Sequence, residues 1–304
     1  MKKKFCIYTV IAGGYDSIKQ PEVTDERFDY ILFSDTPVEN PGVWELRPIP
    51  FQTDNKWQNS RYPKINPHIV LREYDAWLYI DGTIVITSSE VYNRCVELYD
   101  QGVEWGGMVH QCRDCIYDEI NAILGQQWVH DYEVLDWYHF LRTEHFPEHW
   151  GMYENNIIFR ANTPSVKTVD EAWWEYVSQY LVRRDQFVLM YAIWKNPSIR
   201  RADLLPAGQT AWNNDGYFKY TDHIHPEKTK MLPFSLWEKL RFRYVRTFYG
   251  SDSYWMIYFT KWFDKLLTSR APHLMMHLWT AGVAIKYDFR LLAHRFWLRL
   301  TFRR

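Results

Sequence analysis

The sequence has few cysteines, and they do not form a recognisable site. Four cysteines occur in 304 residues, and Cys112 and Cys115 form the only Cys-x-x-Cys. One such pair supplies too few ligands for a structural zinc site, and it lacks the usual sequence context of a redox motif. We therefore expect reduced thiols in a cytoplasmic protein.

Long hydrophobic runs are also missing. No segment approaches the roughly 18 uninterrupted apolar residues of a membrane span. The N-terminus resembles a signal peptide, because three lysines precede the apolar run from Phe5 to Ala12. This run is short, it ends at Gly13 and Gly14, and no small-x-small cleavage site follows it. We interpret it as a first β-strand.

Two common nucleotide-binding signatures are absent after that strand. The glycines at 13 and 14 do not form Gly-x-Gly-x-x-Gly, and no P-loop lysine follows them. A dinucleotide-binding fold and an NTPase are therefore not supported. Glycines directly after a first strand still allow the backbone to approach a ligand closely.

The net charge of −1 conceals an asymmetric distribution. Residues 236–304 contain thirteen Lys/Arg and four Asp/Glu, a net charge of +9, which leaves −10 on residues 1–235. We predict two domains with these bounds, the second helical, basic and rich in aromatic residues. The acidic body and the lack of a recognition motif argue against a nucleic-acid partner.

The extension ends in an amphipathic pattern. From Phe289 to Phe302, arginines alternate with Leu, Phe and Trp, which is typical of a helix at a membrane interface. We predict that 236–304 docks on the anionic inner face of the cell membrane, or that it contributes to acceptor binding. The alternative is a helix packed on the main domain with a solvated basic edge.

The most informative stretch runs from Trp77 to Ile86, where two apolar runs flank Asp81 and Gly82. The runs do not alternate with polar residues, which favours the covered centre of a mostly parallel sheet. An acid at such a strand end faces the crevice where α/β folds bind ligands, and it suits a divalent cation that holds a diphosphate. The alternative is a hairpin turn.

Strands and helices alternate through about residue 200. This order predicts an α/β fold with a mixed, mostly parallel sheet flanked by helices. We expect an edge strand at 43–49 and an amphipathic helix at 164–180. Arg61 and Lys64 are three residues apart, so on a helical turn they would face one anion. The alternative is a solvated basic pair.

Six short motifs occur in an order that resembles a known family. They are Tyr8 to Asp16, Asp29 to Asp35, Arg61-Tyr62-Pro63-Lys64 with Pro67-His68, Tyr79 to Gly82, Glu154 with Phe159-Arg160, and Trp173-Trp174 with Arg184-Asp185-Gln186. Together they resemble the glycosyltransferase-like family typified by a plant seed-mucilage protein. That family is similar to GT-A retaining transferases of the glycogenin and lipopolysaccharide-galactosyltransferase type. The resemblance covers roughly residues 4–225.

The resemblance implies a GT-A-like fold and a retaining glycosyltransferase. The donor would be a nucleoside-diphosphate sugar, a UDP-sugar by analogy, and the acceptor a glycan or glycolipid in surface polysaccharide or lipopolysaccharide synthesis. The nucleotide would lie by Ala12, Gly13 and Tyr15, with its base or ribose near Asp35. Its diphosphate would face Arg61 and Lys64.

The same resemblance implies a catalytic set and a metal site. The relatives' Asp-Gln beside the donor sugar matches Asp185 and Gln186, although Asp185 has the alternative role of a helix N-cap. Glu154 and Asn155 would supply polar sugar or acceptor contacts, with Glu154 in the catalytic set. A cation, Mn²⁺ or Mg²⁺, would be held by Asp81.

A later histidine completes the metal site in those relatives, and we assign His223 to this role rather than His225. Thr83 stands where they have a second carboxylate. This difference motivates a second hypothesis, a non-catalytic GT-A-fold scaffold that binds sugar. A third, a nucleotidyltransferase on a similar fold, is weakened by the lack of a glycine-rich, basic pyrophosphate loop after the first strand.

Overall fold

The computed structural model describes residues 4–125, 128–129, 131–180, 184–210, 212–214 and 216–223. The predicted extension 236–304, its boundary at 235, its membrane role and His225 lie outside the described residues. The described residues up to 116 and from 147 onward form one compact unit, and residues 117–146 belong to a second. None of the helices in this described part is long and apolar enough to cross a membrane.

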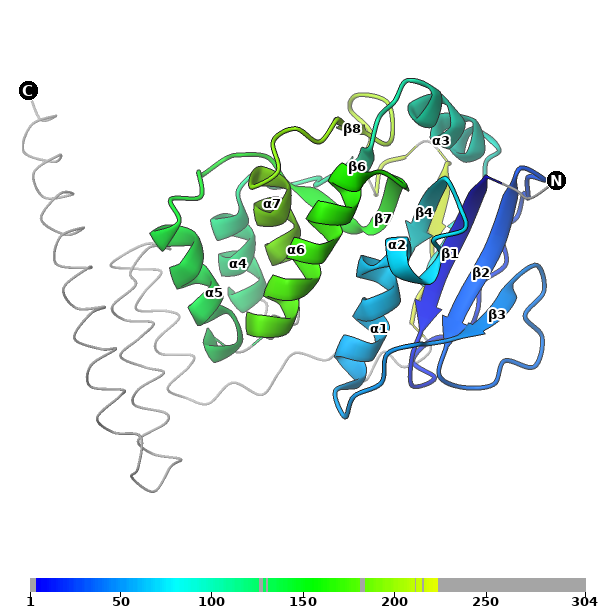
Figure 1. Cartoon of the computed structure of the whole chain (residues 1–304), viewed down its shortest axis with the longest axis horizontal. Coiled ribbons are helices and arrows are strands. Elements are labelled where there is room, and N and C mark those ends of the chain that lie inside the picture. Colours follow the sequence, from blue (N-terminus) through cyan, green and yellow to red (C-terminus); the bar gives the residue numbers. More distant parts are fainter. Residues whose placement is uncertain are drawn as a thin grey trace, which may run out of the picture. The chain divides into compact units, whose positions relative to one another are not determined.

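Seven strands form one sheet in the order β3-β2-β1-β4-β7-β6-β8 (Figure 1). Their bounds are β1 Phe5–Ile11, β2 Phe28–Ser34, β3 Glu45–Pro48, β4 Ala76–Ile80, β6 Trp105–Val109, β7 Tyr153–Ala161 and β8 Arg201–Asp203. Strand β7 is antiparallel to β4 and β6, and the other neighbouring pairs are parallel. The predicted mixed, mostly parallel sheet is confirmed, with β3 at its edge.

Helices cover both faces of this sheet (Figure 1). In the first unit they are α1 Lys56–Ile65, α2 Pro67–Val70, α3 Glu90–Asp100, α6 Pro164–Tyr180 and α7 Gln186–Trp194. On one face, Ile7 and Leu78 join the core together with Leu98 of α3. On the other, Tyr8 contacts the end of α1 and Arg160 contacts α6.

Local signals explain the helix ends nearest the site. Asn55 precedes α1, and its side-chain oxygen accepts a hydrogen bond from the Trp57 amide, which satisfies a donor in the first turn. Pro164 opens α6, where a missing amide hydrogen costs nothing. The Thr163 hydroxyl accepts from the Val166 amide just inside that helix. The predicted helix 164–180 is confirmed.

The second unit contains α4 Ile116–Gly125, apart from its first residue, and α5 Asp131–Thr143. The Arg142 guanidinium of α5 lies over the Tyr117 ring of α4, 3.7 Å from the ring centroid. A cation over an aromatic face is attracted by the ring quadrupole, so this contact ties the two helices together.

The strand β5, Ile84–Ile86, corrects one expectation. It does not join the large sheet but pairs antiparallel with β9, Phe218–Tyr220. All three of its residues are buried, and Ile84 and Ile86 lie in the same core as Leu78 and Ile80 of β4, which explains why the sequence shows no polar alternation. Because β4 pairs with β1 and β7 rather than with β5, the hairpin alternative for Asp81 and Gly82 is wrong.

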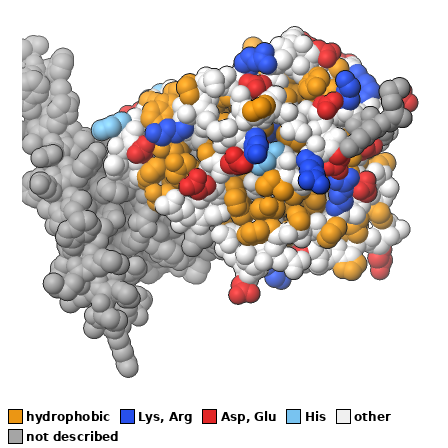
Figure 2. Space-filling model, viewed as in Figure 1, with side chains coloured by type: hydrophobic (Ala, Val, Ile, Leu, Met, Phe, Trp, Pro, Cys, Tyr) orange, Lys and Arg blue, Asp and Glu red, His pale blue; other side chains and the backbone are white. Residues whose placement is uncertain are grey.

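The surface of the described part is electrostatically mixed in the view of Figure 2. Acidic, basic and hydrophobic side chains are interspersed there, without a broad area of one sign. The net charge of −10 on residues 1–235 is therefore not gathered into one patch on this face.

Candidate active site at the carboxyl edge of the sheet

Three elements that are distant in sequence meet at one edge of the sheet. Strands β1 and β4 are parallel, so both end there, and β7, which is antiparallel to β4, begins there. The Asp81 amide after β4 donates to the Asn156 carbonyl in β7 at 2.8 Å. Ligands of α/β folds bind outside the carboxyl ends of such strands. Asp81 therefore lies where the sequence predicted.

Lys64 connects the two acids to which the resemblance gives separate roles. Its Nζ lies 2.9 Å from Asp185 Oδ2 and 3.7 Å from Asp81 Oδ1. Arg61 Nε lies 3.6 Å from Asp185 Oδ1. The Lys64 side chain is only 3% exposed. The spacing of Arg61 and Lys64 does direct both toward one anion, so the solvated-pair alternative is wrong.

Asp185 is held as a buried anion. Burial alone would raise the pKa of Asp185, but Lys64 and Arg61 outweigh it and hold that pKa below its ordinary value. Asp185 stands at the start of α7, yet its side chain makes no capping hydrogen bond. Asp185 thus occupies the N-cap position without capping the helix through its side chain, and its carboxylate faces the two cations of α1 instead.

Asp81 differs from Asp185 because its side chain is 40% exposed. The Tyr79 hydroxyl donates to Asp81 Oδ1 at 2.6 Å. Burial, together with the Asp81 charge, raises the pKa of Tyr79 well above its ordinary value, so this hydroxyl keeps its proton. The carboxylate of Asp81 is thus oriented by a neutral donor and remains accessible to a ligand.

The loop after β1 brings the predicted nucleotide residues together. The Gly13 amide donates to Asp35 Oδ1 at 2.7 Å, and the Tyr15 amide donates to the Ala12 carbonyl at 3.3 Å. Gly13 has φ +63°, a left-handed conformation that residues with a side chain rarely adopt. The turn therefore depends on this glycine. Ala12, Gly13, Tyr15 and Asp35 form one end of the site.

The predicted metal ligand His223 lies at that same end. Its Nδ1 is 2.8 Å from Asp16 Oδ2, and its ring packs edge-on against Tyr15 at 5.0 Å. Among the described residues, neither Asp81 nor His223 belongs to a group of three His, Cys, Asp or Glu side chains close enough to share an ion. The exposed carboxylate of Asp81 fits a cation most of whose ligands are water and phosphate oxygens, as is usual for Mg²⁺.

The polar start of β7 completes the site. Glu154 Oε1 lies 3.5 Å from His110 Nε2, and the Gln186 amide donates to the Tyr153 carbonyl at 3.0 Å. Asn155 is only 6% exposed, and neither atom of its amide has a hydrogen-bond partner. The structure therefore brings Glu154, Asn155 and Gln186 to the edge where Asp81 and Asp185 lie.

Several buried polar atoms without a hydrogen-bond partner lie at this edge. They are Thr9 Oγ1, Arg61 Nε, both amide atoms of Asn155, and Asn156 Oδ1. Buried polar atoms are rarely left unpaired, because each costs about 1–3 kcal/mol. The edge therefore contains hydrogen-bonding capacity that the protein itself does not use.

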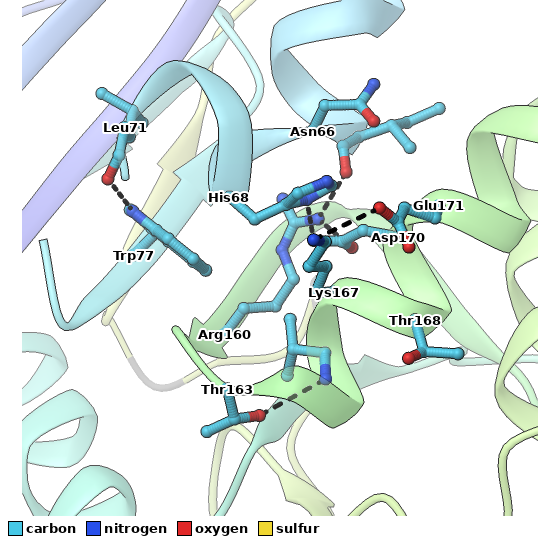
Figure 3. Close-up of polar contacts among 12 residues, drawn as sticks. Asn66, His68, Leu71, Trp77, Arg160, Thr163, Lys167, Thr168, Asp170 and Glu171 are labelled. Atoms are coloured by element: carbon cyan, nitrogen blue, oxygen red, sulfur yellow. Dashed lines mark hydrogen bonds and ion pairs between the residues drawn. The ribbon is translucent and has the colours of Figure 1, made fainter. Parts of the chain in front are cut away.

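Sequence reasoning assigned no role to a buried ion pair behind the site (Figure 3). Arg160 Nη1 lies 2.6 Å from Asp170 Oδ1, and both side chains are fully buried. His68 Nδ1 lies 3.4 Å from the other carboxylate oxygen of Asp170. In the sequence, the feature that could have indicated this pair is Arg160, a charged residue directly after the apolar run Ile157-Ile158-Phe159.

Arg160 also fixes the helix that carries the two cations of the site. It donates to the carbonyl of Lys64 at 2.5 Å and to the carbonyl of Ile65 at 3.2 Å. The Tyr8 hydroxyl donates to the same Lys64 carbonyl at 2.9 Å. These bonds satisfy carbonyls at the C-terminal end of α1, where no intrahelical donor is available. The position of Lys64 therefore depends on Arg160.

No family model matches the sequence, and no curated protein matches it either. Among solved structures, the chain resembles the WbbM bifunctional glycosyltransferase in its apo form, with 10% identity, 67% of this chain and 39% of that chain covered, and a TM-score of 0.39. It also resembles the galactosyltransferase LgtC in complex with donor and acceptor sugar analogues, with 11% identity, 65% and 73% covered, and a TM-score of 0.35. It resembles mouse xyloside xylosyltransferase 1 in its apo form with 10% identity and a TM-score of 0.39, and the match covers 72% of this chain and 95% of that chain.

The chain thus spans about two fifths of the length of WbbM. These solved structures are glycosyltransferases, but the likenesses are distant and establish no shared activity. They also leave the resemblance to the seed-mucilage family a prediction. The activity has to be inferred from the residues of this chain.

Proposed function

We propose that the chain is a glycosyltransferase that takes a sugar from a nucleoside-diphosphate donor, a UDP-sugar, and moves it to a glycan or glycolipid acceptor. The observation that carries this proposal is the cluster of Asp81, Lys64, Asp185 and Arg61, of alternating charge, at the carboxyl edge of the sheet. The unpaired buried polar atoms beside it support a ligand with many hydrogen-bonding groups.

Alternating charge suits the transition state of sugar transfer. As the bond between the sugar and the diphosphate of the donor breaks, negative charge develops on the diphosphate. Positive charge develops on the sugar ring, which becomes oxocarbenium-like. Arg61 and Lys64 would stabilise the leaving diphosphate, and the Asp185 carboxylate would stabilise the sugar. Because these ions already pair with one another, little reorganisation is needed when the donor binds.

The other residues have supporting roles in this proposal. The nucleotide would bind along Ala12, Gly13 and Tyr15, with Asp35 near its base or ribose. Gln186 and Asn155 would orient the sugar through their amides, and Glu154 would contact the acceptor.

We further propose, by resemblance, that the sugar is transferred with retention of configuration in surface polysaccharide or lipopolysaccharide synthesis. The enzyme would act in the cytoplasm and contact the inner membrane face through 236–304.

A divalent cation, Mn²⁺ or Mg²⁺, is part of the proposal through Asp81. When bound, it would add positive charge at the leaving diphosphate. Asp81 would hold it through its exposed carboxylate, and His223 would act through Nε2, since its Nδ1 faces Asp16.

Calorimetric titration of UDP, GDP and CMP, with and without Mn²⁺, tests the donor site. We expect wild type to bind one nucleotide with the help of the metal, and Asp81→Asn to lose that metal dependence. Glu45→Gln is the control, because Glu45 is 59% exposed on the edge strand β3 and carries the same charge. Failure of wild type to bind any nucleotide contradicts the proposal.

A non-catalytic sugar-binding scaffold is the second candidate, and one observation favours it. Thr83 replaces an acid, and its carbonyl is already engaged by the amide and hydroxyl of Thr221, at 2.8 and 2.9 Å. A scaffold would bind nucleotide sugar or glycan without turnover. Transfer of sugar to any acceptor excludes this candidate.

A further inference from the structure

An exposed tryptophan stands on a second aromatic ring next to the proposed site. Trp212 is 59% exposed, and its ring stacks on Tyr220 with centroids 4.5 Å apart and planes at 23°. Because Tyr220 covers one side of the indole and the residue is still more than half exposed, most of the remaining indole surface is open to solvent.

Hydrogen bonds hold this aromatic pair in place. The Thr210 hydroxyl accepts from the amides of Trp212 and Asn213 at 3.3 and 3.1 Å. Asn214, only 6% exposed, accepts from the Phe218 amide through Oδ1 at 3.0 Å. Tyr220 itself pairs with Ile84 in the two-stranded sheet. The loop that carries Trp212 is therefore tied down on both sides.

Tyr220 connects the stack to the site. The side-chain amide of Asn156 donates to the Tyr220 hydroxyl at 3.2 Å. The backbone carbonyl of Asn156 accepts from the backbone amide of Asp81 at 2.8 Å. Asn156 Oδ1 is buried and has no hydrogen-bond partner. Burial, and then the charges of Asp81 and Glu154, raise the pKa of Tyr220 far above its ordinary value. Asp81 is hydrogen-bonded to Asn156, the partner of this hydroxyl, and Glu154 lies two residues before Asn156 in β7, on the same side of the strand.

The local charge indicates what kind of ligand fits. Two carboxylates beside the stack disfavour a phosphate or another anion, whereas neutral hydroxyl groups donate well to carboxylates. The face of an aromatic ring is electron-rich and attracts the weakly positive C–H face of a pyranose. A neutral sugar ring therefore matches both the flat surface and its polar border.

We propose that Trp212 and Tyr220 form a platform on which one pyranose ring of the acceptor stacks, with its hydroxyls toward Asn156 and Glu154. This inference rests on the proposed function and specifies the acceptor side of the same site. The acceptor sugar would then occupy a neutral subsite at Trp212 and Tyr220. The donor diphosphate would bind at the cationic end of the site, at Arg61 and Lys64.

Ligand-observed saturation-transfer NMR tests the platform with three probes: methyl β-galactopyranoside, methyl β-glucopyranoside and methyl α-mannopyranoside. We expect at least one to bind wild type with Kd in the range of about 1–10 mM, with saturation strongest on the C–H protons of one ring face. Trp212→Ala should weaken this binding roughly tenfold, and Trp212→Phe should restore most of it. The control is Leu46→Ala, which truncates an exposed side chain on the edge strand β3.

Calorimetry with UDP on the same variants distinguishes this inference from the proposed function. The platform predicts that Trp212→Ala binds UDP as wild type does. Unchanged glycoside binding in Trp212→Ala overturns the platform, and so does the absence of glycoside binding by wild type at about 100 mM. Glycoside binding that depends on Trp212, in a wild-type chain that binds no nucleotide, overturns the proposed function and retains a sugar platform.

Discussion

Two charge clusters meet at the C-terminal end of α1, and they differ in how far water reaches them. The Arg160–Asp170 pair is fully buried, and Arg160 donates to Asp170, Tyr8 and two backbone carbonyls. In the other cluster, the Asp81 side chain is 40% exposed and the Arg61 side chain is 28% exposed. The first cluster therefore holds the helix in place, while the second is partly open to solvent and can bind a ligand.

The largest effect is expected in the buried cluster. Asp170→Asn leaves Arg160 as a buried charge without its counterion, which should lower the free energy of unfolding by about 3–5 kcal/mol. Denaturant unfolding measures this value. Lys167→Met is the control, because the Lys167–Glu171 pair is exposed on the same helix and should contribute less than about 1 kcal/mol. Equal losses in the two variants contradict a structural role for the Arg160–Asp170 pair.

The next effect concerns transfer rather than stability. Lys64→Met removes the cation between Asp81 and Asp185, and it should lower kcat of sugar transfer by about 10²–10³-fold, the cost of losing one preorganised electrostatic contact. Initial rates with a UDP-sugar measure this loss. A cluster that only stabilises the fold predicts instead an unchanged kcat in the fraction that remains folded.

The pH dependence of stability should follow Asp185. Because its folded pKa lies below the ordinary carboxyl value, its stabilising contribution is present above about pH 4 and is lost as the pH falls through the lowered pKa. Urea midpoints between pH 7 and pH 3 measure this change. Asp185→Asn should flatten the profile, and a variant with the same slope as wild type contradicts the assignment.

The smallest effect is expected at Tyr79. Tyr79→Phe removes the hydroxyl that orients Asp81 but leaves the buried ring in place. We expect stability to fall by about 1 kcal/mol. The Mn²⁺ dependence of UDP binding should weaken without being abolished. Complete loss of nucleotide binding would show that Tyr79 contacts the ligand itself.

Local signals in the sequence were sufficient for much of the fold. Pro164 marked the start of α6, and the acid after an apolar strand placed Asp81 at the sheet edge. The three-residue spacing of Arg61 and Lys64 predicted a shared anion, because residues so spaced lie on one helix face. The spacing did not reveal that Asp185 of this chain is the anion that both side chains face.

Contacts between distant residues account for what could not be predicted. Strand β5 pairs with β9 more than a hundred residues later, and an apolar run alone does not specify its partner. The pairing of His223 with Asp16 and of Arg160 with Asp170 likewise depends on how strands and helices meet in space. Burial of Asn155 without partners is visible only in the folded chain.

The most direct measurement is release of UDP from UDP-sugar donors, as the sugar passes to an added glycan acceptor or to water, by wild type and by Asp185→Asn, each verified to be folded by its unfolding transition. We predict measurable turnover of at least one donor by wild type and by the Glu45→Gln control. Turnover by Asp185→Asn should be lower by about 100-fold or more. No turnover of any donor by wild type, or equal turnover by Asp185→Asn, would contradict the proposal that this charge cluster transfers sugar.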